Sequence, residues 1–246
     1  MKSILLFIIG ISTVLTINAQ WTSTINPSDY SAYGSSIVPD NIGNIYSVGH
    51  VFESSTEKEN ILVVKYSSSG TILWTKTYDH ALDSDKAVKA IVDTDDNLLI
   101  IGTTSSGANG KNILCLKYSA TGDLIKTYEF DGSEHLDDTG ADIVLGENGN
   151  IYVGGTSRIV SQRAFVLIKL DSELELVWQK IHTLYYGADL RKLYFNSTTQ
   201  NIAITGNYTD WENLYITAAV VYDIEGKKYW MKITGLLKIA HLYVLM

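Results

Sequence analysis

A short phrase returns along this chain at a nearly constant distance. It reads GNIYSVG at 43–49, DNLLIIG at 96–102 and GNIYVGG at 149–155. Two other sets of positions recur every 52 residues: Lys65, Lys117, Lys169 and then Val221, and Trp74, Lys126, Trp178 and Trp230. Such a period indicates a repeat architecture, in which each unit buries its apolar faces against its neighbours. We therefore expect the tryptophans in phase, Trp21 included, to pack between units.

Each repeat divides into four short apolar runs, which in the second copy are AVKAIVD, NLLIIGT, NILCLKYS and LIKTYEF. The runs have the length and the β-branched and aromatic content of strands. Segments such as DTDDN and SATG separate them and supply the Asp, Asn and Gly that tight turns need. The sequence therefore predicts an all-β fold, a β-propeller of four-stranded antiparallel blades. A β-helix is the alternative, although its rungs are much shorter than this repeat.

The repeats follow a loose pattern of Asp, an apolar strand, Asp-x-x-Gly-Asn-x-Tyr-x-x-Gly, then Lys-Tyr or Lys-Leu, Gly and Trp. The first repeat supplies Asp40, Gly43, Asn44, Tyr46, Gly49, Lys65, Tyr66, Gly70 and Trp74, and the third supplies Asp138, Gly149, Asn150, Tyr152, Gly155, Lys169 and Trp178. This pattern resembles the SBBP-type (seven-bladed β-propeller) repeats of secreted bacterial proteins, over roughly residues 21–232. The fourth copy departs from it, because TQNIAITG lacks the Gly-Asn and the Tyr. The motif is structural, so the resemblance implies no catalytic residue.

Counting the runs gives about four complete blades, at about 31–82, 83–134, 135–186 and 187–234, after a lone outer strand at 20–30. Residues 235–246 then form an irregular tail or the start of a further blade. Because propellers have four to eight blades, the chain is either an incomplete, truncated propeller, with blades or further domains missing, or a compact ring of four. We expect the incomplete form, whose open ends would expose apolar faces and favour association.

The first residues, MKSILLFIIGISTVLTINAQ, have the pattern of a secretory signal peptide. Lys2 precedes an apolar core, and cleavage after Ala19 fits the small-residue rule, so the signal peptide spans 1–19. The stretch is too short for a membrane span, and no later stretch is longer. A buried first strand or an anchor helix is the alternative. We expect a secreted protein, placed outside the cell, on its surface or in a periplasm.

The net charge and the single cysteine exclude some kinds of partner and chemistry. A net charge of −8 argues against nucleic acid, which needs a basic footprint. The single cysteine, Cys115, allows no intramolecular disulfide, and its apolar setting, NILCLKY, predicts a buried side chain rather than a reactive thiol. The chain also lacks the Gly-x-Ser-x-Gly, His-Glu-x-x-His and phosphate-loop motifs of common enzymes.

Two loops between blades, DHALDSD and DGSEHLDD, are acidic. We take Asp79, Asp83, Asp131, Glu134 and Asp137 as candidate ligand-binding residues, because propellers usually bind ligands at the mouth of the channel. Carboxylates suit a carbohydrate or a hard cation such as Ca²⁺, and no other cofactor is indicated. The alternative is that these residues are solvated and that the recurring Asp85, Asp138 and Asp189 cap the starts of strands.

Trp211 is the one tryptophan outside the repeat phase, with Tyr208 and Tyr215 nearby. An exposed aromatic ring can stack on a sugar, so Trp211 joins the candidate ligand-binding residues; packing over its own blade is the alternative. The segment DTDDN lacks the Gly and the distal Glu of a calcium loop, and we interpret it as a turn.

These observations predict a secreted β-propeller that acts as a binding or scaffold module and recognises a surface glycan or protein. The alternative is an extracellular enzyme, a lyase or a quinoprotein-like oxidoreductase, with its site at the mouth of the channel. No motif favours the enzyme, and no catalytic residue is assigned.

Overall fold

The structure is a computed structural model, and it describes residues 30–53, 56, 58–80, 84–105, 110–160, 162–183, 187–209 and 215–234. Within these ranges, sixteen strands form four antiparallel sheets, each with four strands in chain order. The first sheet holds β1 (Tyr30–Pro39), β2 (Ile45–Glu53), β3 (Lys58–Tyr66) and β4 (Ile72–Tyr78). The second holds β5 (Asp85–Val92), β6 (Leu98–Ser105), β7 (Lys111–Tyr118) and β8 (Leu124–Phe130). The third holds β9 (Asp138–Leu145), β10 (Ile151–Ile159), β11 (Gln162–Leu170) and β12 (Leu176–Thr183), and the fourth β13 (Gly187–Asn196), β14 (Asn201–Thr209), β15 (Tyr215–Asp223) and β16 (Lys228–Thr234).

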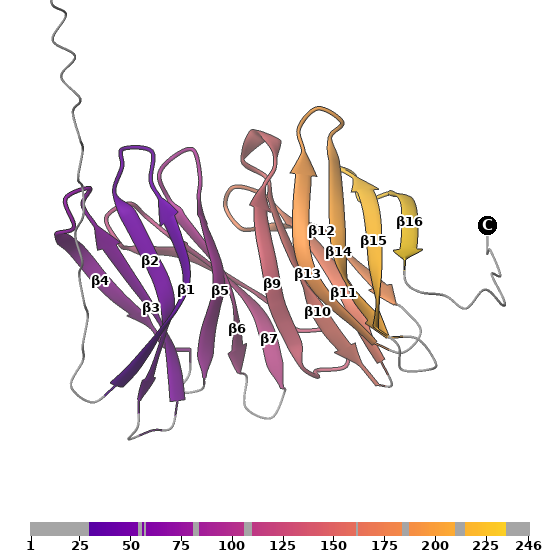
Figure 1. Ribbon diagram of the computed structural model, residues 1–246, viewed down its shortest axis with the longest axis horizontal. Helices are drawn as coiled ribbons and strands as arrows, with labels where there is room; N and C mark the ends of the chain where they lie inside the picture. Colours follow the sequence, from indigo (N-terminus) through magenta and orange to yellow (C-terminus); the bar gives the residue numbers. More distant parts are fainter. Residues whose placement is uncertain are drawn as a thin grey trace, which may run out of the picture.

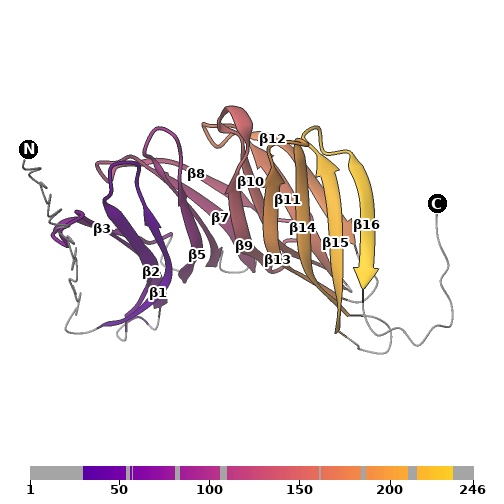
Figure 2. The same ribbon diagram turned by 45° about the horizontal axis from the view of Figure 1, so that its top comes forward.

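The four sheets are blades of a β-propeller, here called blades 1 to 4. Figures 1 and 2 show them in chain order along an arc, with blade 1 and blade 4 at opposite ends. The first strand of each blade is the inner one, because β1 packs beside β5, β5 beside β9 and β9 beside β13. The described residues therefore form an open arc and not the closed ring of four that the sequence allowed.

Burial follows the position of each strand in its blade. The third strand β7 is buried from Asn112 to Tyr118, because neighbouring blades cover both of its faces. In the outer strand β8, exposed and half-buried side chains alternate from Ile125 to Glu129, and only Phe130 at its end is buried. Three clusters of buried apolar side chains fill the spaces between successive blades. Cys115 lies in the cluster between blades 2 and 3, and burial raises the pKa of its thiol to about 12, as expected for an inert side chain.

The glycine that closes each repeated phrase faces a bulge in the inner strand. One extra residue is inserted opposite this glycine in every blade: Ser35, Val88, Ala141 and Arg191. A Cβ atom on Gly102 would lie 2.3 Å from the carbonyl oxygen of Lys86. A Cβ atom on Gly206 would lie 2.1 Å from the carbonyl oxygen of Asp189. Only glycine leaves room for the bulged backbone, which explains its recurrence.

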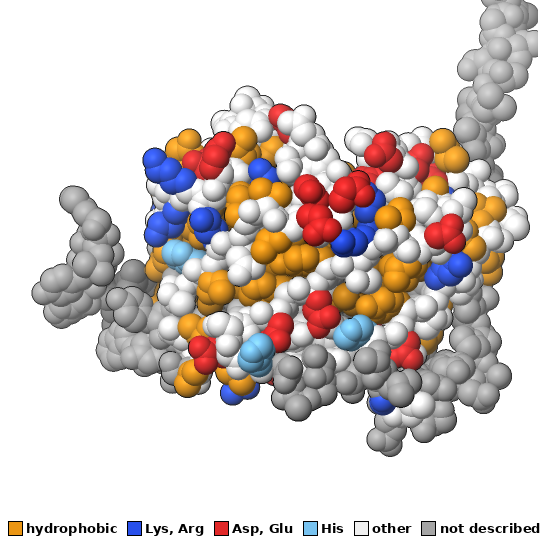
Figure 3. Space-filling model, turned by 180° about the vertical axis from the view of Figure 1, so that it is seen from behind, with side chains coloured by type: hydrophobic (Ala, Val, Ile, Leu, Met, Phe, Trp, Pro, Cys, Tyr) orange, Lys and Arg blue, Asp and Glu red, His pale blue; other side chains and the backbone are white. Residues whose placement is uncertain are grey.

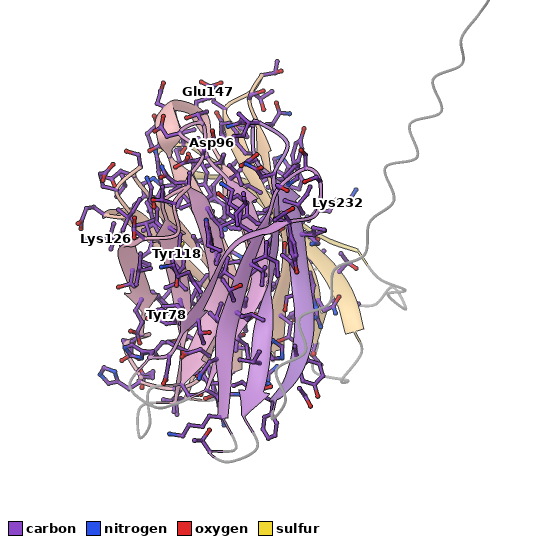
Figure 4. The ribbon with its side chains drawn as sticks, turned by 90° about the vertical axis from the view of Figure 1, so that its left-hand side faces the viewer. Tyr78, Asp96, Tyr118, Lys126, Glu147 and Lys232 are labelled. Carbon is purple, nitrogen blue, oxygen red and sulfur yellow. The ribbon has the colours of Figure 1, made fainter. Side chains whose placement is uncertain are left out.

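Aspartates organise the turns between first and second strands. Asp40 and Asp93 each accept hydrogen bonds from backbone N–H groups two and four residues later. The segment DTDDN thus serves as a turn, as its sequence predicts. In the third blade the short 3₁₀ element η2 (Glu147–Gly149) occupies this place. Figure 4 shows Asp96 and Glu147, from two of these turns, at one end of the molecule, and Tyr78, which ends β4, farther toward the other end.

The repeated lysines join each blade to the next one. Lys65 donates from Nζ to the hydroxyl of Tyr46 at 2.8 Å and to the carbonyl oxygen of Ala120, in blade 2, at 3.1 Å. Lys117 and Lys169 donate in the same way to the carbonyl oxygens of Ser172 and Ile224. In each case the acceptor lies in the turn between the third and fourth strands of the following blade.

The tryptophans in phase do not all pack between blades. Trp74 and Trp178 do, and their indole N–H groups donate to the carbonyl oxygens of Ala120 and Ile224. Trp230, on the outer strand of blade 4, is 51% exposed, so the prediction that it packs between blades is wrong. The physical reason is that no described blade follows blade 4 to cover it. Trp21 lies outside the described residues. The same holds for residues 20–29 of the lone outer strand expected at 20–30.

The outer strands also leave apolar side chains in contact with solvent. Ile72, Leu124 and Leu176 share one position of the repeat, and all three are exposed. Figure 3, which views the molecule from behind, shows hydrophobic side chains across this face, interspersed with charged and polar ones. Within the described ranges, no helix is long and apolar enough to cross a membrane.

Candidate functional site

A pocket of about 390 Å³ lies where the inner strands of blades 2, 3 and 4 meet. Its volume falls within the range of small-ligand sites, roughly 300–1,000 Å³. The extra residues of three bulges line it, namely Val88, Ala141 and Arg191. The remaining polar side chains of the lining are Thr139, Thr156, Arg163 and Asp189. The same bulges that require the repeated glycines therefore shape the pocket.

The pocket carries a positive charge in an acidic protein. Arg163 pairs with Asp189, with Nη1 and Oδ1 2.9 Å apart. Arg191 is exposed, and no acidic side chain among the described residues pairs with it. Two guanidinium groups and one carboxylate give the lining a net charge of +1, whereas the whole chain carries −8. One guanidinium is therefore available to an anionic group.

Hydrogen bonds between blades fix the walls of this pocket. The buried carboxylate of Asp142, in blade 3, accepts from Lys89 Nζ of blade 2 at 2.5 Å and from the backbone N–H of Leu193 in blade 4 at 2.8 Å. The hydroxyl of Thr156 accepts from the backbone N–H of Leu190 at 3.0 Å. These contacts cross the seams between blades, so the pocket is held in shape before a ligand arrives.

The predicted acidic residues that the structure describes, Asp79, Asp131, Glu134 and Asp137, are not in the lining of this pocket. Asp79, Glu134 and Asp137 are exposed in the loops between blades, and Asp137 Oδ1 accepts from the backbone N–H of Lys111 at 3.2 Å. Asp131 is half-buried and hydrogen bonds to Nδ1 of His135 at 2.6 Å. Asp83 and Trp211 lie outside the described residues. In the part of the chain that is described, no three His, Cys, Asp or Glu side chains are placed to hold a metal ion.

Two of the recurring aspartates do cap the starts of strands. Oδ2 of Asp85 accepts from the backbone N–H of His80 at 2.7 Å, and Oδ2 of Asp138 accepts from that of Gly132 at 2.6 Å. Burial raises the pKa of both carboxyl groups, and the hydrogen bonds offset only part of that effect. In blade 4 the equivalent position, counted from the bulge, is Ala188. Asp189, one residue later, lines the pocket, so the expectation that it caps the start of a strand is wrong.

Arg163 and Arg191 were not among the residues predicted for the site. The available signal was the phase of the repeat, because Arg191 stands in the fourth copy where the earlier copies have Ser35, Val88 and Ala141. A charge at a position that is otherwise small or apolar marks a departure from the frame. The bulge that shows these positions to be equivalent is visible only in the structure.

Similar solved structures share the fold at low identity. No family model matches this sequence, and no curated protein matches it. A protein of unknown function from Dyadobacter fermentans aligns at a TM-score of 0.53 and 12% identity, over 84% of this chain and 70% of that one. The subtype N10 neuraminidase-like protein of A/little yellow-shouldered bat/Guatemala/060/2010 aligns at a TM-score of 0.50 and 13% identity, over 85% of this chain and 60% of that one. The acylaminoacyl peptidase of Pyrococcus horikoshii aligns at 0.50 and 11%, over 81% and 32%.

The chain thus spans about 60% of the length of the neuraminidase-like protein and a third of the peptidase. At these identities the likeness concerns the fold alone. It agrees with the four-stranded blades and the arc described above, and the chain has the architecture of a β-propeller.

Proposed function

We propose that this protein is a secreted binding module that recognises a carboxylate-bearing surface glycan at the pocket between blades 2, 3 and 4. The observation that carries the proposal is the guanidinium of Arg191, which has no acidic partner among the described residues, in a pocket whose walls are fixed by hydrogen bonds. A guanidinium presents two parallel N–H donors that match a carboxylate. The hydroxyl of Thr139 adds a group that can hydrogen bond to a sugar hydroxyl. Secretion, which the signal peptide predicts, would bring the pocket to such glycans.

The test is a glycan array that contains matched neutral and carboxylated saccharides, probed with the wild-type protein and with Arg191→Met. We expect binding to carboxylated members, weaker binding as salt is raised, and loss of binding in Arg191→Met. Lys111→Met removes an exposed cation outside the pocket and should bind as wild type does. Absence of binding, or binding that Arg191→Met leaves unchanged, would contradict the proposal. An acidic peptide probed in parallel tests whether a protein carboxylate is the ligand instead.

The lining of the pocket does not have the arrangement of a glycoside hydrolase. Hydrolysis of a glycosidic bond normally uses two carboxyl groups on either side of the bond. Asp189 is the one carboxylate in the lining, and it is paired with Arg163. We therefore propose binding, and not hydrolysis of a glycosidic bond, as the function of this pocket.

A further inference from the structure

The structure shows a pairing rule between each outer strand and the turn of the next blade. Trp74 lies against Gly122 of blade 2, where an added Cβ atom would be 3.0 Å from the indole. Trp178 lies against Gly226 of blade 4 in the same way, at 3.1 Å. In both turns the glycine has a positive φ, +89° and +78°. A tryptophan on one blade thus goes together with a glycine on the next.

The seam between blades 2 and 3 departs from the rule on both sides at once. Lys126 replaces the tryptophan, and Leu174 replaces the glycine of the facing turn. Leu174 is 1% exposed and belongs to the apolar cluster between these blades, so its side chain fills space that an indole would need. Lys126 pairs with Glu175 of the same turn at 2.5 Å. The chain therefore contains two kinds of matched pair, Trp with Gly and Lys with Leu.

Blade 1 carries a turn of the glycine type. The backbone N–H of Gly70 donates to the carbonyl oxygen of Ser67 at 2.9 Å, as that of Gly122 does to Ser119 at 3.0 Å. Gly70 has a φ of +86°, close to that of Gly122. By the pairing rule this turn receives a tryptophan, and the carbonyl oxygen equivalent to that of Ala120 is the one of Ser68.

The face of blade 1 that points away from blade 2 is also covered. Val63 packs in the cluster against blade 2, so its neighbour Val64 points to the opposite face, because side chains alternate along a strand. Val64 is nevertheless only 3% exposed, and Tyr66, two residues on, is 8% exposed. No other described blade lies on that side (Figure 1).

We propose that the occupant is the segment around Trp21, with its indole on Gly70 and its N–H donating to the carbonyl oxygen of Ser68. Trp21 precedes Gly70 by 49 residues, and Trp74 and Trp178 precede their glycines by 48. Trp21 also precedes Ala32 by 11 residues, as Trp74 precedes Asp85, the equivalent residue of blade 2. The chain thus has the length that seats a tryptophan on the turn. The exposed Trp230 of a second copy is the competing occupant.

The test is a double-mutant cycle in the full chain with Trp21→Lys and Gly70→Leu, which exchanges one of the protein's matched pairs for the other. Each single variant should lower the melting temperature. The double variant should lower it by clearly less than the sum, because Lys with Leu is a pair that the fold already accommodates. Gly43→Leu is the matched control, since Gly43 has a φ of +90° and nothing within 4 Å of an added Cβ atom. Its effect should add to that of Trp21→Lys.

Additive effects of Trp21→Lys and Gly70→Leu would overturn the proposal. So would coupling of Gly70 to Trp230→Lys that grows with protein concentration, because the occupant would then be a second copy. If Gly70→Leu does not fold, Gly70→Ala replaces it in the cycle. The expected result is then a smaller effect of Gly70→Ala in the Trp21→Lys background than in the wild type, since the indole that its methyl group meets is gone.

Discussion

The side chain of Lys65 makes polar contacts with two blades. Its ammonium group lies 3.1 Å from Asp40 Oδ2, and the side chains of both residues are almost fully buried. Burial alone would raise the pKa of Asp40, but hydrogen bonds from Asn44 and Lys65 lower it, so the carboxylate stays charged. The pKa of Lys65 is raised, because the hydroxyl of Tyr46 and the Asp40 carboxylate outweigh the opposing effect of burial. The pair is ionised at neutral pH and organises the turn of blade 1.

Replacing Lys65 by Met should destabilise the protein by about 3 kcal/mol, because it leaves a buried carboxylate without its partner and removes a bond to blade 2. Chemical denaturation measures the free energy of unfolding. Lys232→Met is the control, since Lys232 is an exposed lysine of similar length at the edge of blade 4 (Figure 4). Equal losses in the two variants would contradict the role assigned to Lys65.

Asp138 should give the protein a measurable pH dependence. Its folded pKa lies above the ordinary value of 3.8, mainly because of burial. Stability from this group is therefore fully present below pH 3.8 and is lost as pH rises through the folded pKa. In Asp138→Asn the amide oxygen can still accept from Gly132, but nothing titrates. Relative to wild type, the variant should become more stable from pH 4 to pH 7, as measured by denaturation at several pH values. A constant difference would count against a raised pKa.

At the scale of elements, each blade is specified by its turns and by one glycine opposite a bulge. The turn between the third and fourth strands has two roles. It closes a hairpin, and it presents a carbonyl oxygen to the preceding blade. Their glycine is therefore constrained by conformation and by space. The two constraints can be separated by experiment.

Gly122→Ala should destabilise the protein more than Gly43→Ala. Both glycines have a φ near +90°, so the backbone strain of an added side chain is common to the two variants. Only at Gly122 does the new Cβ atom meet the indole of Trp74, while at Gly43 nothing lies within 4 Å. Overpacking of this kind costs about 1–3 kcal/mol, and thermal or chemical unfolding should show that difference. Equal effects would mean that conformation alone selects glycine there.

At the scale of the whole molecule, the end face of blade 4 differs from the faces inside the arc. Thr217 and Ala219 stand where blade 3 has Phe165 and Leu167, so this face has lost much of its apolar side-chain volume. Trp230 and Tyr194 remain exposed there. The face is less apolar than a seam between blades, yet it still carries two large rings that can drive association.

Trp230→Lys should reduce self-association. Lys126 shows that the outer strand accepts a lysine at this position, so the fold should persist. Sedimentation velocity or light scattering over a range of concentrations should show a smaller concentration-dependent increase in mass than for wild type. Ile125→Lys also introduces a charge at an exposed apolar position, but on the outer strand of blade 2 and not on the end face of blade 4. It should leave association unchanged. The same reduction in both variants would point to general solubility and not to the end face.

The sequence by itself determined the repeat, the four strands of each blade, the turn chemistry and the propeller fold. It could do so because local periodicity and turn residues report directly on strands and hairpins. The role of Asp85 and Asp138 as caps was also within its reach. The tertiary structure decided the pocket, the pairing of Arg163 with Asp189 and the exposure of Trp230. It also decided that Ala188, and not Asp189, holds the position of the capping aspartates in blade 4. These features depend on bulges that shift the register by one residue and on which blade, if any, lies across a seam, and neither is encoded by spacing along the chain.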